Sequence, residues 1–300
     1  MSLFAKLRAE RLIAEMKAAD SADDSARRKA MQKLVKLGPS VLLTVIDALA
    51  SADKQETVGF VGVISTLLDD KSFSTVAKGM ADGNQRTVAG IAAAMSSSRG
   101  YSPANLYRLL GDPSMPKGPL VGVIADQKSR LNPRDLLQHA YKQEASEKAA
   151  LFRVISETAG PELVPELLSR LEGKDPIART HIINILSRFD RPEVAEALQG
   201  QLKDTNKFIR QAVLNALPKL GGNVNAELLC EVLRDPDVET QQKAIDAVVR
   251  ATHPDTMKYL VKILRDEDES ARRAAVEVLN EIGTLDHIKF LLQSIKDDDW

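Results

Sequence analysis

The sequence predicts an all-α fold, a right-handed α-solenoid of about nine helical hairpins that each span 31 residues. A turn aspartate recurs at this interval, as Asp204, Asp235, Asp266 and Asp297. Within each repeat, apolar residues recur four positions apart, which places them on one face of a helix. No segment shows the alternating pattern of a half-buried strand. These observations together indicate stacked pairs of helices without a sheet.

The elements follow in a regular order along the chain. Residues 1–17 lie outside the repeat and are expected to form an amphipathic capping helix, whereas residues 18–300 form an array of nine repeats and an incomplete tenth. Each repeat is expected to contain a first helix of about 12 residues, a turn often marked by proline, and a second helix of about 10 residues. One such hairpin cannot bury its apolar face alone, so the repeats are expected to stack.

Two apolar columns define the core face of the first helices, and we predict that their 31-residue register holds without an insertion from about residue 18 to residue 296. The turn aspartates are expected to cap the helix that follows, and cations six residues later, such as Arg210, are expected to link adjacent turns. The chain stops before the first helix of the tenth repeat, so we expect it to be a fragment or to dock by its end. The two columns are Val58, Ala89, Leu120, Leu151, Ile182, Val213, Ala244 and Ala275, and then Gly62, Ala93, Ile124, Ile155, Leu186, Leu217, Val248 and Leu279.

The composition excludes several classes of protein. The chain carries 41 Lys and Arg against 42 Asp and Glu, and the net charge of −1 argues against a bulk affinity for nucleic acid or anionic membranes. Cys230 is the single cysteine, which excludes an internal disulfide framework and suits a reducing, cytoplasmic location. No apolar run approaches the roughly 20 residues of a membrane span.

The turns with Asp followed six residues later by Arg or Lys, and the alanine- and leucine-rich cores, as in residues 266–283, resemble the short HEAT-like repeats of the phycobilisome-lyase type. The resemblance covers nearly the whole chain and implies a solenoid. HEAT-like families include scaffolds, bilin lyases, DNA glycosylases and a di-iron oxygenase that holds its metal with His-Glu pairs. No histidine here precedes a glutamate, so no metal site and no cofactor are expected. The four histidines are His139, His181, His253 and His287.

A basic strip on the second helices is the candidate partner-binding site. It comprises Tyr107, Arg108, His139 and Arg170, which recur in three successive repeats. Packed helices would place these side chains roughly 10 Å apart. The strip therefore predicts a groove for an acidic protein segment or another anion, with an ordinary solvated polar face as the alternative.

An apolar patch on two first helices is the second candidate contact surface. Phe60, Ile64, Ile91 and Met95 occupy columns that are polar in later repeats, where they hold residues such as Arg153. We therefore predict that these four side chains face outward and are covered by the N-terminal helix or by another chain.

These observations predict a cytoplasmic scaffold for protein–protein interactions that performs no catalysis. The expected partner is a protein, for which the basic strip suggests acidic character, and self-association through the apolar patch is a further expectation. A membrane partner is not expected, and nucleic acid is disfavoured. Two alternatives stay open: a bilin lyase-like chaperone for a chromophore, from the resemblance alone, and nucleic-acid binding through the basic strip.

Overall fold

A computed structural model describes residues 3–18, 24–221, 224–284 and 287. Two compact units divide the chain, an N-terminal unit of Met1–Thr158 and a C-terminal unit of Ala159–Trp300. The described residues of both units form helices and turns and no strand, which confirms the all-α solenoid. The predicted turn residue Asp297 and the incomplete tenth repeat lie outside the described residues.

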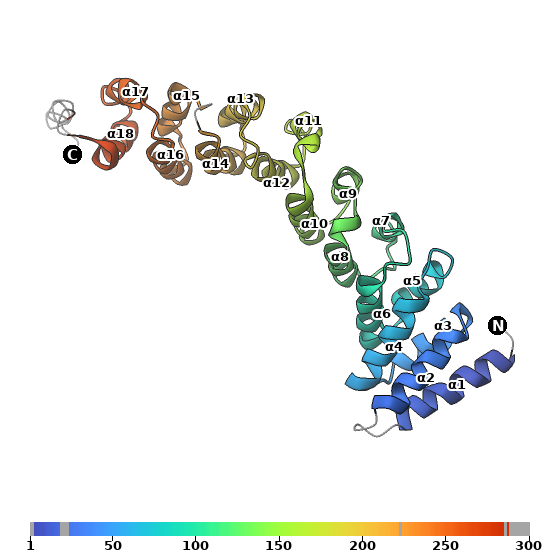
Figure 1. Cartoon of the computed structure of the whole chain (residues 1–300). Coiled ribbons are helices and arrows are strands. Elements are labelled where there is room, and N and C mark those ends of the chain that lie inside the picture. The colour runs from blue at the N-terminus through green and yellow to red at the C-terminus, as the bar shows by residue number, and fades with distance from the viewer. Residues whose placement is uncertain (1–2, 19–23, 222–223, 285–286, 288–300) are drawn as a thin grey trace. The chain divides into compact units, whose positions relative to one another are not determined.

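Helices of the N-terminal unit alternate between two rows (Figure 1). First helices α4, α6, α8 and α10 pack side by side in one row, and second helices such as α7 and α9 pack in the other. Helix α1 packs against α2 and α3 at the start of the rows. The helices are α1 (Leu3–Ala18), α2 (Asp24–Lys36), α3 (Leu42–Leu49), α4 (Lys54–Leu67), α5 (Phe73–Asp82), α6 (Gln85–Ser97), α7 (Ala104–Leu110), α8 (Lys117–Asp126), α9 (Pro133–Ala140) and α10 (Ala145–Thr158).

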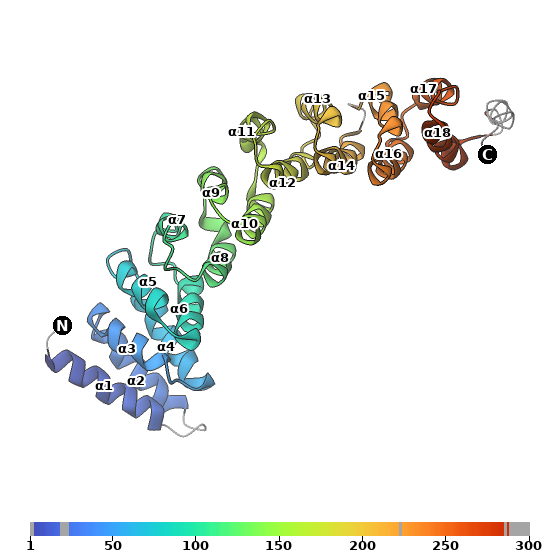
Figure 2. The same ribbon diagram turned by 180° about the vertical axis from the view of Figure 1, so that it is seen from behind.

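Helices of the C-terminal unit alternate in the same way (Figure 2). First helices α12, α14, α16 and α18 pack in sequence, and α15 packs against α17 in the other row. The helices are α11 (Val164–Ser169), α12 (Pro176–Leu186), α13 (Pro192–Gly200), α14 (Lys207–Ala216), α15 (Ala226–Glu231), α16 (Val238–Ala251), α17 (Thr256–Ile263) and α18 (Glu269–Ile282). No helix in the described part of the chain is long and apolar enough to cross a bilayer.

The predicted core columns are confirmed from α8 to α18 and wrong in α4 and α6. Val58 was expected in the core but is 70 % exposed, whereas Phe60 is fully buried. The register explains the error. Phe60 and Ile91 are 31 residues apart, but Ile91 and its structural equivalent Leu120, on α8, are only 29 apart. The repeat is therefore shortened by two residues between α6 and α8, and a constant period misplaces every earlier side chain.

The apolar patch predicted to face outward is consequently part of the core. Phe60, Ile64, Ile91 and Met95 are all fully buried within the chain itself. They are buried because α4 packs against α2, α3 and α6, and α6 packs against α5 and α8. The surface on which the expectation of self-association rested is therefore absent.

Small residues bring the helices of the N-terminal unit close together. A Cβ atom added at Gly59 would lie 2.7 Å from the Met16 Cε of α1, and one at Gly90 would lie 2.9 Å from Leu49 of α3. Glycine at these positions thus makes room for a neighbouring side chain. The predicted capping helix contributes to this packing through Met16, which is itself fully buried.

A neutral amide joins adjacent repeats where the register changes. Gln127, directly after α8, is fully buried, and its Nε2 donates to the backbone oxygens of Met95, Ser96 and Ser98 at the end of α6, at 2.7, 2.8 and 3.0 Å. Its Oε1 accepts from Arg130 at 2.9 Å. One side chain therefore satisfies several carbonyls that the end of a helix leaves without partners.

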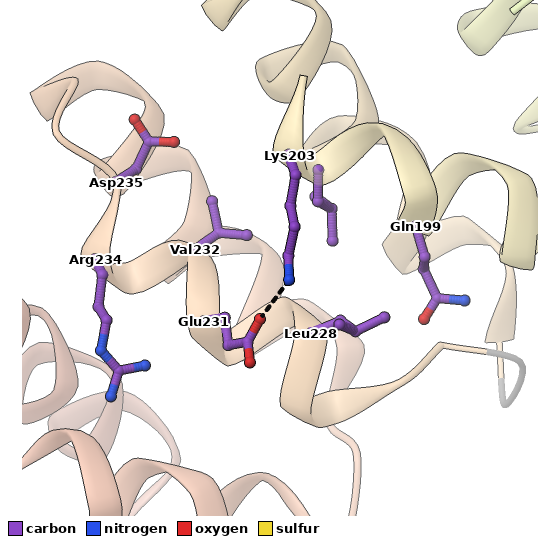
Figure 3. A pocket seen from close by; sticks show the side chains of 8 residues that line it. Gln199, Lys203, Leu228, Glu231, Val232, Arg234 and Asp235 are labelled. Atoms are coloured by element: carbon purple, nitrogen blue, oxygen red, sulfur yellow. Dashed lines mark ion pairs between the residues drawn. The ribbon is translucent and has the colours of Figure 1, made fainter. Parts of the chain in front are cut away.

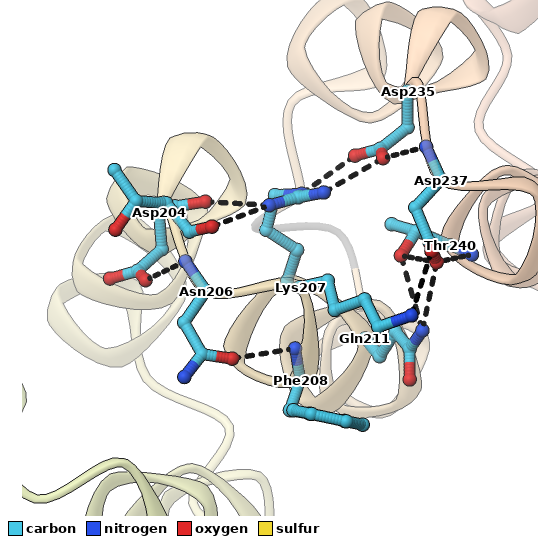
Figure 4. Close-up of polar contacts among 10 residues, drawn as sticks. Asp204, Asn206, Lys207, Phe208, Gln211, Asp235, Asp237 and Thr240 are labelled. Carbon is cyan, nitrogen blue, oxygen red and sulfur yellow. Dashed lines mark hydrogen bonds and ion pairs between the residues drawn. The ribbon is translucent and has the colours of Figure 1, made fainter.

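An ionic ladder joins adjacent repeats in the C-terminal unit (Figure 4). Arg210 forms a bidentate pair with Asp235 of the next turn, at 2.7 and 2.8 Å, and also donates to the backbone oxygen of Asp204 at 2.8 Å. Arg179 pairs with Asp204 one repeat earlier. The predicted link between adjacent turns through Arg210 is therefore confirmed.

The turn aspartates themselves do not cap the helices, which corrects that prediction. Asp235 accepts from the backbone N–H of Asp237 at 3.0 Å, and Asp237, two residues later, caps α16 by accepting from Thr240 N at 3.0 Å. Asn206 fills the same place before α14, where it accepts from Phe208 N at 2.9 Å (Figure 4). The first acid closes the turn and so leaves a carboxylate oxygen for the arginine of the preceding repeat.

Candidate functional site

Two aromatic rings form the centre of a groove between α7 and α9. The Tyr107 ring of α7 stacks on the His139 ring of α9, with centroids 5.1 Å apart and an interplanar angle of 9°. The Tyr107 hydroxyl donates to the backbone oxygen of Asn132 at 3.1 Å. Asn132 in turn caps α9 by accepting from Arg134 N at 2.9 Å, so the hydroxyl ties α7 to the start of α9.

Both rings are uncharged at neutral pH. Burial raises the pKa of Tyr107 to about 12, so its hydroxyl stays a hydrogen-bond donor. Burial also lowers the pKa of His139 below its ordinary value of 6.5, because the protonated ring would lose hydration. The stacked pair therefore presents a neutral, flat surface.

Cations flank this surface. The groove has a volume of about 560 Å³, and Tyr107, Arg108 and His139 all line it together with Lys142. Arg108 and Lys142 are exposed, and no side chain among the described residues lies within hydrogen-bond or ion-pair distance of their charged groups. Two charges without partners next to a flat aromatic pair make the groove able to bind a carboxylate.

Lys117 also lines the groove but has a structural role. Its Nζ donates to the backbone oxygens of Leu109, Leu110 and Asp112, at 3.3, 2.7 and 2.6 Å. These carbonyls lie at the end of α7, where a cation offsets the helix dipole. Lys117 belongs to the cation column of the repeat and corresponds there to Arg179 and Arg210, which is why it faces a turn.

Acidic side chains limit the basic character of the groove. Glu144 and Glu147 line it as well. The Glu147 carboxylate accepts from Ser146 Oγ at 2.5 Å, and this hydrogen bond is the main reason why its pKa is lowered. The groove therefore carries charges of both signs, which favours one register of a charged partner over others.

The structure brings together three of the four residues predicted for the basic strip. Tyr107, Arg108 and His139 share the groove, whereas Arg170 belongs to the C-terminal unit. There Arg170 follows α11 and forms an ion pair with Glu166, one helical turn earlier, at 2.8 Å.

Sequence reasoning missed Lys142, although the signal was present. Lys142 stands 62 residues, or two 31-residue repeats, before Asp204, so it occupies the position of the ladder aspartate. A cation in a column of turn acids marks a repeat in which the ladder is interrupted.

The equivalent groove of the C-terminal unit shows the contrast (Figure 3). It has a volume of about 370 Å³ and is lined by Lys203, Glu231 and Asp235 among others. Lys203 pairs with Glu231 across the groove at 3.4 Å. Asp235 stands 93 residues, or three repeats, after Lys142 and so occupies the same column. This groove therefore neutralises its own lysine, whereas the groove at α7 and α9 leaves two cations available.

The remaining candidate for chemistry is a core residue. Cys230 of α15 is buried, as the sequence predicted, and burial raises its thiol pKa to about 12. It therefore stays a protonated thiol and a poor nucleophile. Within the described residues, no group of three or more His, Cys, Asp or Glu side chains could hold a metal ion.

Comparison with known proteins identifies the repeat. The family profile of HEAT repeats matches residues 133–218, 164–239 and 226–300, which together span more than half of the chain. No curated protein matches the sequence.

Several solved structures share the helical-repeat arrangement. Human deoxyhypusine hydroxylase is 15% identical over 93% of this chain and 97% of that chain, with a TM-score of 0.36. An engineered protein is 15% identical over 96% of this chain and 82% of that chain, with a TM-score of 0.34. Crescerin, described as using a TOG domain array to regulate microtubules in the primary cilium, is 19% identical over 81% of this chain and 90% of that chain, with a TM-score of 0.27. At these TM-scores none of the three carries an argument about function.

Proposed function

The chain belongs to the HEAT-repeat family, and on that premise we propose that it is a non-catalytic, cytoplasmic scaffold that binds an acidic segment of a protein partner. Stacked repeats present long, continuous surfaces on which a partner can lie. The observation that carries the proposal is the groove in which Arg108 and Lys142, neither of them paired with a side chain in the described part of the chain, flank the stacked Tyr107 and His139 rings.

The chemistry of the groove supports a carboxylate-bearing ligand. The Arg108 guanidinium can donate two parallel hydrogen bonds to one carboxylate, and Lys142 adds a second positive charge. Tyrosine and arginine are also the side chains that most often dominate the energy of a protein interface. The neutral rings supply apolar contact area at a small cost in side-chain entropy.

The test is the affinity of the native partner, recovered from host lysate by cross-linking and then measured by calorimetry. Arg108→Glu with Lys142→Glu should weaken binding at least tenfold, since each change replaces an attraction by a repulsion. Lys203→Glu is the matched control, because Lys203 lines the equivalent groove but is already paired with Glu231. Arg170→Glu tests whether the binding strip extends into the C-terminal unit. Unchanged affinity in the double variant would refute the proposed site.

Two other functions can be separated from this one with the same variants. A bilin chaperone should shift the visible absorption band of an added bilin. A protein that binds nucleic acid should retard the migration of an oligonucleotide in a gel, and this retardation should disappear at moderate salt. Under the proposal neither effect depends on Arg108 or Lys142. A bilin shift or a retarded oligonucleotide that the double variant abolishes would favour the corresponding alternative.

A further inference from the structure

A second groove of the N-terminal unit lies between first helices α2 and α4, which pack side by side. It has a volume of about 540 Å³. The α2 residues that line it are spaced three, four, seven and eight positions from the first, so they form one continuous face of that helix. The lining residues are Arg28, Met31, Gln32, Val35 and Lys36 from α2, and Gly62, Val63 and Thr66 from α4.

The floor of the groove is apolar and recessed. Val63 is fully buried, and Met31 and Val35 are half-buried on the wall formed by α2. Gly62 has no side chain, and a Cβ atom there would lie 3.0 Å from Met31 Cε. The hollow therefore exists because α4 carries glycine at this point. An apolar recess open to solvent is typical of a surface that binds another molecule.

The rim of the groove is basic at its two ends, where Arg28 and Lys36 line it, whereas the other basic residues of α2 lie outside the lining. Helix α2 contains five basic residues, Arg27, Arg28, Lys29, Lys33 and Lys36, and one acidic residue. Lys29, Lys33 and Lys36 are exposed, and none of the three forms an ion pair with the described residues. Arg28 and Lys36 mark the two ends of the groove-lining face, eight residues and thus about 12 Å apart along the helix.

We propose that this groove binds an amphipathic helix of a protein partner, with an apolar stripe flanked by acidic residues. The apolar stripe would contact Met31 and Val35, and acids about two turns apart on the partner would meet Arg28 and Lys36. The recess decides between a helix and a membrane surface. A helix can insert side chains into a hollow, whereas binding to a bilayer requires apolar side chains that protrude. This site is separate from the groove at α7 and α9 and does not depend on the function proposed for it.

The experiment uses the full chain and a fluorescein-labelled helical peptide with leucines on one face and glutamates beside them. Fluorescence anisotropy should show saturable binding. A peptide with serines in place of the leucines, and one with lysines in place of the glutamates, should each bind at least tenfold more weakly. Absence of saturable binding by the leucine–glutamate peptide would overturn the proposal.

Two variants of the chain place the binding site. Gly62→Leu fills the hollow and should weaken binding at least tenfold. The only atom near an added Cβ in the described residues is the flexible end of Met31, at 3.0 Å, and leucine favours helix more than glycine does, so the chain should still fold, which circular dichroism checks. Lys36→Glu should also weaken binding and make the remaining affinity less sensitive to salt, because it removes an electrostatic attraction that salt screens. Lys71→Glu, at an exposed lysine before α5, is the control and should leave affinity unchanged. Unchanged affinity in Gly62→Leu would overturn the site.

A final arm uses vesicles of anionic phospholipid and the same variants. The proposal expects the intact chain to stay in the supernatant when vesicles are sedimented at physiological salt. Co-sedimentation that Gly62→Leu or Lys36→Glu abolishes would overturn the helix-binding proposal in favour of a membrane surface.

Discussion

The two units join their repeats with different chemistry. In the C-terminal unit, Arg179 and Arg210 pair with Asp204 and Asp235 of the following turns. In the N-terminal unit, the neutral side chain of Gln127 holds the end of α6, and glycines allow close helix packing. The ladder requires an acid and an arginine at fixed places in every repeat. It can therefore form only where successive repeats have the same length. Where the period shortens, between α6 and α8, hydrogen bonds from Gln127 and Arg130 to backbone oxygens at and after the end of α6 take the place of the ladder.

The largest expected effect tests the change of register. Phe60→Ala should lower the free energy of unfolding by about 3–5 kcal/mol, because it empties a fully buried site. Val58→Ala, two residues earlier and 70 % exposed, should stay within about 0.5 kcal/mol of the parent. Urea denaturation followed by circular dichroism measures both. If the 31-residue register were constant, Val58→Ala would cost more stability than Phe60→Ala. Equal losses, or a larger loss for Val58→Ala, would therefore contradict the shortened repeat between α6 and α8.

The second prediction compares the two ways of joining repeats. Arg210→Gln leaves Asp235 buried without its bidentate partner and should cost about 1.5–3 kcal/mol. Gln127→Leu removes a donor from three backbone oxygens at the end of α6 and should cost about 1–3 kcal/mol, although the oxygen of Met95 keeps its hydrogen bond from the Tyr101 hydroxyl. Hydrogen exchange resolved by peptide should show lost protection in α14 and α16 for the first variant, and in α6 and α8 for the second. Loss of protection spread evenly over both units would contradict this assignment.

Low pH should weaken the ionic ladder of the C-terminal unit but not the hydrogen bonds of Gln127. The hydrogen bond from Lys207 is the main cause that lowers the pKa of Asp237, from 3.8 to about 2. At Asp266 the backbone N–H of Asp268 is the main cause of a lowered pKa. At Asp204 burial is the largest single effect and raises the pKa, but the hydrogen bonds from Arg179 and from the backbone N–H of Asn206, together with the nearby arginine charges, outweigh it and lower the pKa. A carboxylate with a lowered pKa stabilises the fold above its unfolded pKa, and the gain is lost as pH falls through the folded value.

The C-terminal unit should therefore lose exchange protection as the pH falls from about 4 towards 2, and Asp237→Asn should lessen this dependence. The bonds of Gln127 involve no carboxylate and should persist over the same range. In the N-terminal unit the lowered pKa of Glu157 comes mainly from its exposed hydrogen bond with Lys128. Lys128→Met is the control and should change the acid response of α10 alone. Equal acid sensitivity at α6 and α16 would contradict the distinction.

The sequence was sufficient for the fold because its strongest signals repeat. The apolar columns from Leu120 to Leu279 and the cation at Arg210 each recur in successive helices, so an error at one position is corrected by the others. The register of α4 could not be derived in this way, because Val58 and Phe60 are both apolar and two residues apart. Only the packing of α4 against its neighbours decides which of them is buried.

The candidate site was partly predictable for a related reason. Arg108 and His139 lie in one column, with Tyr107 beside Arg108, so the period alone places the three residues near one another. The stacking of the two rings and the hydrogen bond to Asn132 depend on rotamers that no period specifies. Lys142 is available because no acidic side chain in the described residues pairs with it. This becomes visible only when its groove is compared with the equivalent groove, which contains Glu231 and Asp235.

The smallest expected effect concerns two turns that end first helices. Gly38, after α2, and Thr252, after α16, both have a positive φ, of 73° and 44°, but only Thr252 is in the left-handed α region, because ψ of Gly38 is −171°. Glycine adopts both conformations without strain, whereas threonine is β-branched and is strained at a positive φ. Thr252→Gly should therefore raise the free energy of unfolding by about 0.5–1 kcal/mol, since relief of a strain of 1–2 kcal/mol outweighs the added entropy of the unfolded chain.

Gly38→Ala is the comparison in the N-terminal unit and should lower the free energy of unfolding by at least about 1 kcal/mol, because essentially only glycine combines a positive φ with an extended ψ. No atom lies within 4 Å of a Cβ added at Gly38, so a steric clash cannot account for the loss and the change isolates backbone strain. Urea denaturation midpoints of both variants measure the pair. If Thr252→Gly were destabilising, the hydrogen bonds and packing around Thr252 would have to outweigh its backbone strain, which would contradict the prediction.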